Sequence, residues 1–501
     1  MCGLRRVSVV LALTAIWGGC GAGAATPPPA ADAALDSDPG ADRASDDSSH
    51  NDAPASDSAG ETVDAGPDAG TDTNIPADDA ATDTAVPTDG AVNDGSGSAG
   101  DGATGLEKTD AYPPVVFPPE NPYSDSKALL GKVLFWEEQL GSKNNEACGS
   151  CHRASAGGSD PRASEPQSLG AGPDKVFGTP DDVHGGRGIP RCDSAGQPVS
   201  APPYGLAAQV TDRKPPTAFD AMFASELFWD GRAGTEFLDP VTGAVAIARG
   251  GALESQAAGP PVSSVEMSCE GTTWRDIETK LVTAKPLAFA KSIPKSMTDF
   301  IGTKTYPQLF SQVYSSSEIT ARKILFAIAT YERTLTSNNT AWDLFNAGQT
   351  RALNSEQQAG LALFNTKARC NKCHMAPLFA DDKFHNIGLN DPTLDRGRSV
   401  ITGDPADLGK MRTPTLRNVG LRAMGGMMHS GADNGATMDT VMNTYNMGGL
   451  FKNNLDQEMQ MLNLTQNEID NLIDFMVNGL TDPRVLNRLP PFDSPKLSTE
   501  P

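Results

Sequence analysis

The stretch Cys370-Asn371-Lys372-Cys373-His374 decides how the rest of the chain is interpreted. Two thiols three residues apart, followed at once by an imidazole, are what covalent attachment of a c-type haem requires: each sulfur takes one vinyl group, and the histidine becomes the proximal iron ligand. A second copy, Cys148-Gly149-Ser150-Cys151-His152, stands upstream. One copy alone could be structural or half of a zinc site. Two copies, in a chain with eight Cys and six His and no pair spaced to complete a zinc tetrahedron, predict two covalently bound haems.

The amino terminus has the pattern of an export signal. Arg5 and Arg6 precede a short apolar run, residues 7–17, which is too short to span a bilayer, so we assign residues 1–20 to a signal peptide. Export to the periplasm suits c-type haem, whose attachment follows export. Gly18-Gly19-Cys20 resembles the end of a bacterial lipoprotein signal, so Cys20 could carry a lipid anchor in the outer membrane. The alternative is cleavage after Ala22-Gly23-Ala24 and a free periplasmic protein.

Residues 21–110 are dominated by Ala, Asp, Gly, Pro, Ser and Thr. Such a segment cannot bury enough apolar surface to offset its chain entropy, and we predict a disordered tether. It holds 20 acidic and 2 basic residues, a net charge of −18, whereas residues 111–501 carry −7 of the chain's −23. The acidity therefore belongs to an extended, self-repelling linker and gives no indication of nucleic-acid binding.

The remaining sequence indicates a mostly α-helical fold with long loops. Apolar residues at helical spacing over 126–136 lead into the first haem motif, and those over 319–335 and 355–364 precede the second. A last helix opens with the capping box Thr465-Gln466-Asn467-Glu468 and ends at Gly479. We predict two c-type cytochrome domains with one covalent haem each, and divide the chain into an N-terminal domain at 111–300, a C-terminal domain at 301–490 and a tail at 491–501.

Further motifs follow one another in a fixed order between about residues 120 and 485. They are Phe228-Trp229-Asp230-Gly231-Arg232, Gln256-Ala257-Ala258-Gly259-Pro260, Val265-Glu266-Met267, residues 329–335, Phe384-His385-Asn386-Ile387-Gly388, Asp395-Arg396-Gly397-Arg398 and residues 413–419. Together they resemble the bacterial di-haem cytochrome c peroxidase superfamily, which includes the MauG-type enzymes. Two insertions depart from the family pattern, one at residues 234–251 and one after His152.

The resemblance implies a division of labour between the haems. The haem held by His152 would be the peroxidatic one, and the haem held by His374 would store or relay an electron. By the same resemblance Glu266 is the acid/base of peroxide reduction, Gln256 its distal hydrogen-bonding partner, and Trp229 the electron relay between the haems. From the residues alone, Trp229 could equally be a core side chain and Glu266 a surface one.

The resemblance places the sixth ligand of the C-terminal haem at Tyr445, the residue type that MauG-type members use. A phenolate is a hard anionic donor that favours ferric and higher-valent iron, whereas a thioether favours ferrous iron. Met447 lies two residues away and remains open as the ligand, as in the ordinary peroxidases. The third alternative is that Tyr445 is a core residue before the Gly448-Gly449 turn.

The other histidines and cysteines carry weaker predictions. No histidine stands where peroxidases of the family carry a distal one; His184 is the nearest candidate, and a solvated loop histidine is the alternative. We expect His385 to hydrogen-bond near the second haem rather than to bind iron, and His429 matches a histidine of a family block. Cys192 and Cys269 could form a disulfide, but the sequence leaves their proximity open.

Lys214 leads to a prediction that goes against the family. Its members hold Ca²⁺ between the haems with an asparagine fifteen residues before the tryptophan and with backbone carbonyls. Lys214 occupies that position relative to Trp229. An ammonium offers no oxygen donor and repels a cation at close range. We therefore predict that calcium is absent and that the Lys214 ammonium takes its place, donating to carbonyls around Met424 and Gly426.

These features together predict a di-haem cytochrome c peroxidase that reduces hydrogen peroxide to water. Its electrons would come from a small donor protein, a cytochrome c or a cupredoxin. One alternative is a MauG-like oxidant that acts on a protein or organic partner through high-valent haem. Another is a di-haem electron-transfer protein without catalysis. An absorption spectrum separates them, because a high-spin ferric band indicates an open iron site.

Overall fold

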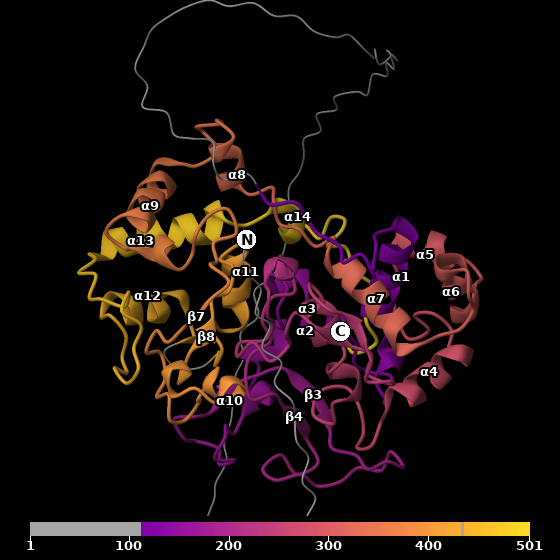
Figure 1. The fold of residues 1–501 in the computed structure, drawn as a ribbon. Helices are drawn as coiled ribbons and strands as arrows, with labels where there is room; N and C mark the ends of the chain where they lie inside the picture. The colour runs from indigo at the N-terminus through magenta and orange to yellow at the C-terminus, as the bar shows by residue number, and fades with distance from the viewer. Residues whose placement is uncertain (1–111, 432–434, 501) are drawn as a thin grey trace, which may run out of the picture. The chain divides into compact units, whose positions relative to one another are not determined.

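The computed structural model describes residues 112–431 and 435–500 (Figure 1). The signal peptide and acidic tether expected from the sequence, with Cys20, lie outside these residues. Within them the regular structure is mainly helical, which agrees with the predicted fold class. No helix in these two ranges is both long enough and apolar enough to cross a bilayer.

The helices are short and are separated by long loops. Their bounds are α1 Asp125–Phe135, α2 Cys148–Cys151, α3 Ala252–Ala257, α4 Trp274–Thr283, α5 Lys295–Ile301, α6 Tyr306–Tyr314, α7 Ala321–Glu332, α8 Ala341–Asn346, α9 Ser355–Asn365, α10 Ser399–Thr402, α11 Val419–Arg422, α12 Met438–Asn446, α13 Gln466–Asp474 and α14 Pro483–Leu486.

The strands form four small antiparallel pairs in the described part of the chain. They are β1 Leu169–Gly170 with β2 Val183–His184, β3 Arg187–Pro190 with β4 Ala208–Val210, β5 Phe237–Leu238 with β6 Val245–Ile247, and β7 Phe384–His385 with β8 Met411–Arg412. Each pair is a separate two-stranded sheet, so the strands connect neighbouring loops and do not form a layer of the fold.

The predicted helices before each haem motif are confirmed as α1, α7 and α9, with ends shifted by one to three residues. α1 begins after Ser124, whose hydroxyl accepts a hydrogen bond from the Lys127 N–H at 3.2 Å. Thr320 caps α7 in the same way through the Lys323 N–H, at 3.3 Å. In each helix the cap satisfies one of the amides that the first turn leaves unpaired.

The predicted capping box of the last helix is also confirmed. The Glu468 carboxylate accepts a hydrogen bond from the Thr465 N–H at 2.8 Å, and the Thr465 hydroxyl accepts one from the Glu468 N–H at 3.4 Å. α13 then passes into a single π-helical segment, Phe475–Gly479, so the helical path ends at the predicted Gly479.

One hydrophobic core lies among α1 and α4–α7. α1 and α7 approach closely because position 131 is glycine: a Cβ there would lie 1.8 Å from the Ala327 carbonyl oxygen. Phe492 and Leu497, from the predicted tail, are buried in the same core. α6 and α7, which the sequence-based division assigns to the C-terminal haem domain, therefore pack with the N-terminal one, and the boundary near residue 300 stays a prediction.

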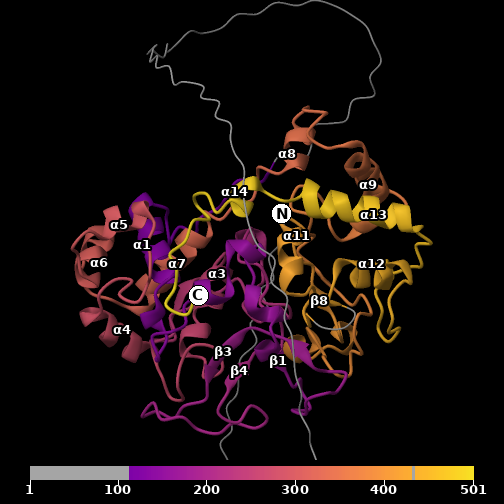
Figure 2. The ribbon, with the colours of Figure 1, turned by 180° about the vertical axis from the view of Figure 1, so that it is seen from behind.

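A second core gathers α8, α9, α12 and α13 (Figure 2). Its centre is a group of aromatic rings, with Phe364 and Phe379 both packed edge-on against Phe475. α9 ends at Asn365 and the chain turns directly into the second haem motif. The aromatic cluster thus fixes the point from which Cys370 and His374 are presented.

Candidate functional site

The first haem motif lies on the wall of a cavity of about 770 Å³ lined by Cys148, Cys151 and His152. α2 starts at the first cysteine because the Ser150 hydroxyl accepts a hydrogen bond from the Ala147 N–H, at 3.0 Å. Glycine between the cysteines allows a close approach, since a Cβ at Gly149 would lie 2.3 Å from the Trp136 ring. The motif is therefore presented by a rigid local framework.

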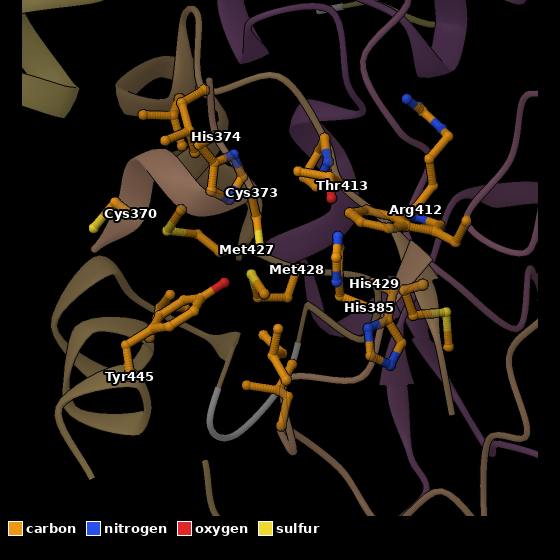
Figure 3. Close-up of a pocket in the computed structure, with 18 of the residues that line it drawn as sticks. Cys370, Cys373, His374, His385, Arg412, Thr413, Met427, Met428, His429 and Tyr445 are labelled. Atoms are coloured by element: carbon orange, nitrogen blue, oxygen red, sulfur yellow. The ribbon is translucent and has the colours of Figure 1, made fainter. Parts of the chain in front are cut away.

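The second haem motif lines a separate cavity, shown in Figure 3. Cys370, Cys373 and His374 form part of its wall, and side chains from α12 and from the segment Met427-Met428-His429 form others. Most of this lining is apolar, as a site for a large aromatic cofactor requires.

The donor groups of both motifs fit haem. His152 Nδ1 pairs with the Gly158 carbonyl at 3.0 Å and His374 Nδ1 with the Phe379 carbonyl at 2.9 Å. A protonated Nδ1 that donates to a carbonyl leaves Nε2 as the free base, which is how metal-ligating histidines are usually oriented. Burial lowers the pKa of both imidazoles and favours this neutral form.

The four motif cysteines are free thiols, so neither pair is closed into a disulfide that would compete with haem.

Trp229 lies in the wall that the two cavities share. It is 9% exposed, and its indole N–H donates to the Lys214 carbonyl at 2.7 Å. The ring of His429 packs edge-on against it, with centroids 6.0 Å apart. The predicted relay residue is thus held in one orientation between the two candidate haem sites.

Glu266 and Gln256 both line the first cavity, together with the first haem motif. Gln256 lies on α3. Glu266 lies in a turn, where its backbone N–H donates to the Ser263 hydroxyl at 3.3 Å. Burial raises the pKa of Glu266, while Ser263 and the cationic Arg232 act in the opposite direction. The structure therefore brings the predicted acid/base and its partner to the cavity of His152.

Tyr445 projects from α12 into the second cavity, with its hydroxyl directed towards Met427 and Met428 (Figure 3). Burial raises the pKa of its phenol. Met447, the alternative ligand from the sequence, lies at the end of α12, is 50% exposed and does not belong to the described cavity wall. Of the two sequence candidates, only Tyr445 faces the second haem site.

Lys214 is almost fully buried, with 3% of its surface exposed. Its Nζ donates to the Gly426 carbonyl and, at 3.1 Å, to the Arg422 carbonyl. The predicted contact with the Gly426 region is present. Burial, aided by Arg422, lowers the pKa of Lys214 to about 7, while Asp160 acts to raise it.

The remaining histidines occupy different environments. His184 is not part of either described cavity wall; its backbone N–H donates to the Ser430 carbonyl at 2.7 Å. His385 pairs with Asp456 at 2.6 Å and with Asp381 at 2.8 Å, so both of its nitrogens are engaged. The bond to Asp381 is the largest cause that raises the pKa of His385, and Cys373 and Asp456 act in the same direction. Together with Cys373 and Asp381, His385 could hold a metal ion only if that thiol were not used for haem.

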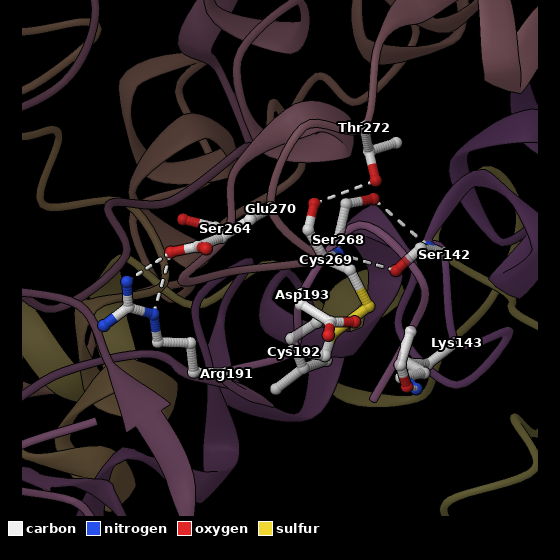
Figure 4. The surroundings of a disulfide bond; sticks show 12 residues. Ser142, Lys143, Arg191, Cys192, Asp193, Ser264, Ser268, Cys269, Glu270 and Thr272 are labelled. Atoms are coloured by element: carbon white, nitrogen blue, oxygen red, sulfur yellow. Dashed lines mark hydrogen bonds and ion pairs between the residues drawn. A yellow bond between two sulfur atoms is a disulfide. The ribbon is translucent and has the colours of Figure 1, made fainter. Parts of the chain in front are cut away.

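Cys192 and Cys269 form a disulfide, with Cα atoms 4.8 Å apart (Figure 4). The sequence offered the pair but not its proximity, because 77 residues separate the two cysteines. Both are buried beside Ile189.

Sequence reasoning missed Glu332, at the end of α7. It lines the first cavity one helical turn after Ile328, and it is 5% exposed. Its Oε2 has no hydrogen-bond partner among the described residues. Burial raises the pKa of Glu332 to about 8. A glutamate on the apolar face of a predicted helix was the available signal.

Comparison with known proteins places this geometry in a family. The pattern that defines the family described as "Di-haem cytochrome c peroxidase" matches residues 125–351. The methylamine utilization protein MauG of Methylophilus methylotrophus is 28% identical over 361 residues, which cover 72% of this chain and 84% of that protein. The cytochrome-c peroxidase IdrP1 of Denitromonas iodatirespirans is 27% identical over 419 residues, 77% of this chain and 88% of that protein.

Solved structures share the fold. A MauG-like protein associated with microbial copper homeostasis superposes with a TM-score of 0.54 at 22% identity, covering 78% of this chain and 99% of that one. The diheme peroxidase BthA from Burkholderia thailandensis superposes with a TM-score of 0.50 at 19% identity, covering 76% and 92%. Over residues 125–351 the chain therefore matches the di-haem cytochrome c peroxidase family, and over about three quarters of its length it is similar to cytochrome-c peroxidase and MauG proteins, which are oxidoreductases with haem as their cofactor.

Proposed function

We propose that the protein is a di-haem peroxidase that reduces hydrogen peroxide to two molecules of water, taking up two protons and two electrons. The observation that carries the proposal is the first cavity, where Glu266 and Gln256 share a wall with His152 while Trp229 separates this cavity from the second. An acid/base, an imidazole donor and an electron path are what this reaction needs.

Both haems are attached covalently in this proposal. Cys148 and Cys151 form the thioethers of the first, and Cys370 and Cys373 those of the second. His152 and His374 supply Nε2 to the iron, each oriented by the carbonyl that accepts from its Nδ1. Haem, when bound, supplies an iron centre that can bind peroxide and exchange electrons.

Glu266 performs the proton transfer. Its carboxylate would take a proton from one oxygen of the peroxide and return it to the oxygen that leaves as water, and Gln256 would orient the peroxide by hydrogen bonds. The raised pKa of Glu266 brings its proton affinity closer to the working pH, which favours both halves of this transfer.

Trp229 carries electrons between the two sites. Its indole N–H is held by the Lys214 carbonyl, and its ring by His429, so little reorganisation accompanies electron transfer. The electrons enter from a small donor protein, a cytochrome c or a cupredoxin. The signal peptide predicted at residues 1–20 supports a periplasmic location, with a lipid anchor at Cys20 as one alternative and a free periplasmic protein as the other.

A second candidate function is MauG-like oxidation of a protein or organic partner. The orientation of Tyr445 favours it, because the phenol faces the second cavity whereas Met447 does not. A phenolate ligand stabilises oxidised iron, and a haem of that kind suits an oxidant better than an electron store of high potential.

We also propose that the contact between the two sites needs no calcium. The Lys214 amine already donates to the Gly426 and Arg422 carbonyls, and the side chain is 3% exposed. A hard cation would have to displace these hydrogen bonds and gain no side-chain oxygen from Lys214.

The test is a spectroscopic redox titration of the holoprotein, with and without peroxide, followed by turnover with reduced cytochrome c and with reduced cupredoxin. We expect a high-spin ferric site and peroxide-dependent oxidation of a donor. Two low-spin haems at every potential and no turnover would instead identify an electron carrier. Oxidation of a partner without net consumption of donor electrons would favour the MauG-like function.

A further inference from the structure

The loop that carries Glu266 has little internal structure. Residues 263–270 form turns, not helix or strand. Within the loop, the Met267 and Ser268 N–H groups donate to the Ser263 carbonyl at 3.1 and 2.9 Å, which closes one turn. The position of that turn, and with it the Glu266 carboxyl, depends on what the loop is attached to.

One attachment lies just before Glu266. The Ile189 N–H, from β3, donates to the Val265 carbonyl at 3.2 Å, and the Gln209 side chain, from β4, donates to the Ser264 carbonyl at 2.7 Å. The approach of β3 depends on Gly188, where a Cβ would lie 1.8 Å from the Val265 carbonyl oxygen. Only glycine allows the two backbones to lie this close.

The other attachment lies just after Glu266 (Figure 4). The disulfide joins Cys269 to Cys192, two residues beyond the end of β3. The Glu270 N–H donates to the Cys192 carbonyl at 2.9 Å, and the Glu270 carboxylate accepts from Arg191 at 2.8 Å. Ser142 also holds this side of the loop, since its N–H donates to the Met267 carbonyl at 3.1 Å and its hydroxyl accepts from the Cys269 N–H at 2.7 Å. The one structural unit that contacts the loop on both sides of Glu266 is residues 187–210, which we call the β3–β4 bracket.

The β3–β4 bracket is in turn tied to the first haem motif. Arg162 donates to the Arg187 carbonyl at 3.0 Å and to the Cys151 sulfur at 3.3 Å, while its guanidinium pairs with Glu146 at 3.1 Å. One arginine therefore connects the cysteine that would carry the haem with the strand that holds the Glu266 loop.

We propose that the β3–β4 bracket, closed by the Cys192–Cys269 disulfide, is a positioning device that fixes the Glu266 carboxyl relative to the first haem motif. The inference rests on the proposed function, because it concerns the acid/base of peroxide reduction. A general acid/base works only within hydrogen-bonding reach, and a displacement of about 1 Å can cost about 100-fold in rate.

Two independent changes open the bracket at its two ends. The first is the double variant Cys192→Ser/Cys269→Ser, and the second is Gly188→Ala. The matched control is Gly234→Ala, because a Cβ at Gly234 meets nothing within 4 Å. Each variant is prepared as the full chain with its haems, and covalent haem is counted first.

The main measurement is amide hydrogen exchange of residues 264–268, followed by mass spectrometry. We expect residues 264–268 to exchange faster than in wild type in both opened variants and at the wild-type rate in the control. The amides of α1 and α7 should exchange at the wild-type rate in all three. Peroxide turnover should fall about tenfold or more in the opened variants at unchanged haem content. The acid limb of the turnover profile should move to lower pH, because a more hydrated Glu266 loses the burial that raises its pKa.

If the variants do not fold, the folded wild-type holoprotein is reduced, alkylated at Cys192 and Cys269, freed of reductant and reoxidised before the same measurements. Unchanged exchange at residues 264–268, or unchanged turnover and pH profile after the exchange has increased, would overturn the positioning role. The proposed function has a separate criterion, since it fails if Glu266→Gln keeps full turnover whatever the bracket variants do.

Discussion

Replacing Lys214 with methionine removes the amine that joins the Gly426 and Arg422 carbonyls and keeps a side chain of similar length. Lys214 is 3% exposed, so methionine leaves both carbonyls buried without this donor. Each unsatisfied buried carbonyl lowers the free energy of unfolding by about 1–3 kcal/mol. Part of this loss is offset because the variant no longer buries an amine. We expect a loss of about 2–4 kcal/mol in the free energy of unfolding.

The assay is denaturant unfolding of the holoprotein, followed by far-UV circular dichroism. The control is Lys295→Met, since the Lys295 side chain is 85% exposed and its pairing with Asp299 is worth only a few tenths of a kcal/mol. Equal stability of Lys214→Met and wild type would refute the reasoning, because it would mean that the buried amine contributes nothing to this junction.

A second substitution at the same position tests the calcium proposal. Lys214→Asn supplies a side-chain oxygen beside the same carbonyls, so this variant should gain stability from added Ca²⁺, by about 2.7 kcal/mol at a hundredfold excess over the dissociation constant. Wild type should show the same melting temperature and activity with calcium and with a chelator. One calcium held tightly by wild type, with activity lost on its removal, would contradict the account.

Three further predictions concern single side chains. Glu266→Gln should keep both haems and lose about 10²–10⁴-fold in peroxide turnover; a loss below about tenfold would remove Glu266 from its role. Tyr445→Phe should change the low-spin spectrum of the C-terminal haem alone, and an effect only at Met447 would transfer the ligand to methionine. Because burial raises the pKa of Glu332 to about 8, the native chain holds a proton that the unfolded chain releases near 4.5, so stability should fall as pH rises between these values. Glu332→Gln should abolish this slope in unfolding titrations, and a slope that survives would show that another group causes it.

Local chemistry in the sequence predicts local structure well here. The Thr465–Glu468 capping box and the glycine at 479 define the last helix at both ends, because caps are set by residues three or four positions apart. The two haem motifs likewise predict haem attachment from five consecutive residues each. The contact of Lys214 with Gly426 was predictable only because the family resemblance links positions more than 200 residues apart in the sequence.

Features that depend on burial could not be predicted in this way. The sequence does not show that Phe492 and Leu497 return to the first core, nor that Cys192 meets Cys269 across 77 residues. The strands of the β3–β4 bracket are too short to leave an alternating pattern in the sequence. Glu332 was passed over because only the fold turns that face of α7 towards a cavity.

We propose that this chain carries two haems, each bound covalently through one Cys-X-X-Cys-His motif. The most direct measurement is the intact mass of the denatured holoprotein, with pyridine haemochrome analysis of the same sample. We predict the mass of the processed chain plus two haems, and a c-type haemochrome spectrum at two haems per chain. One haem, or none that survives denaturation, would contradict the account.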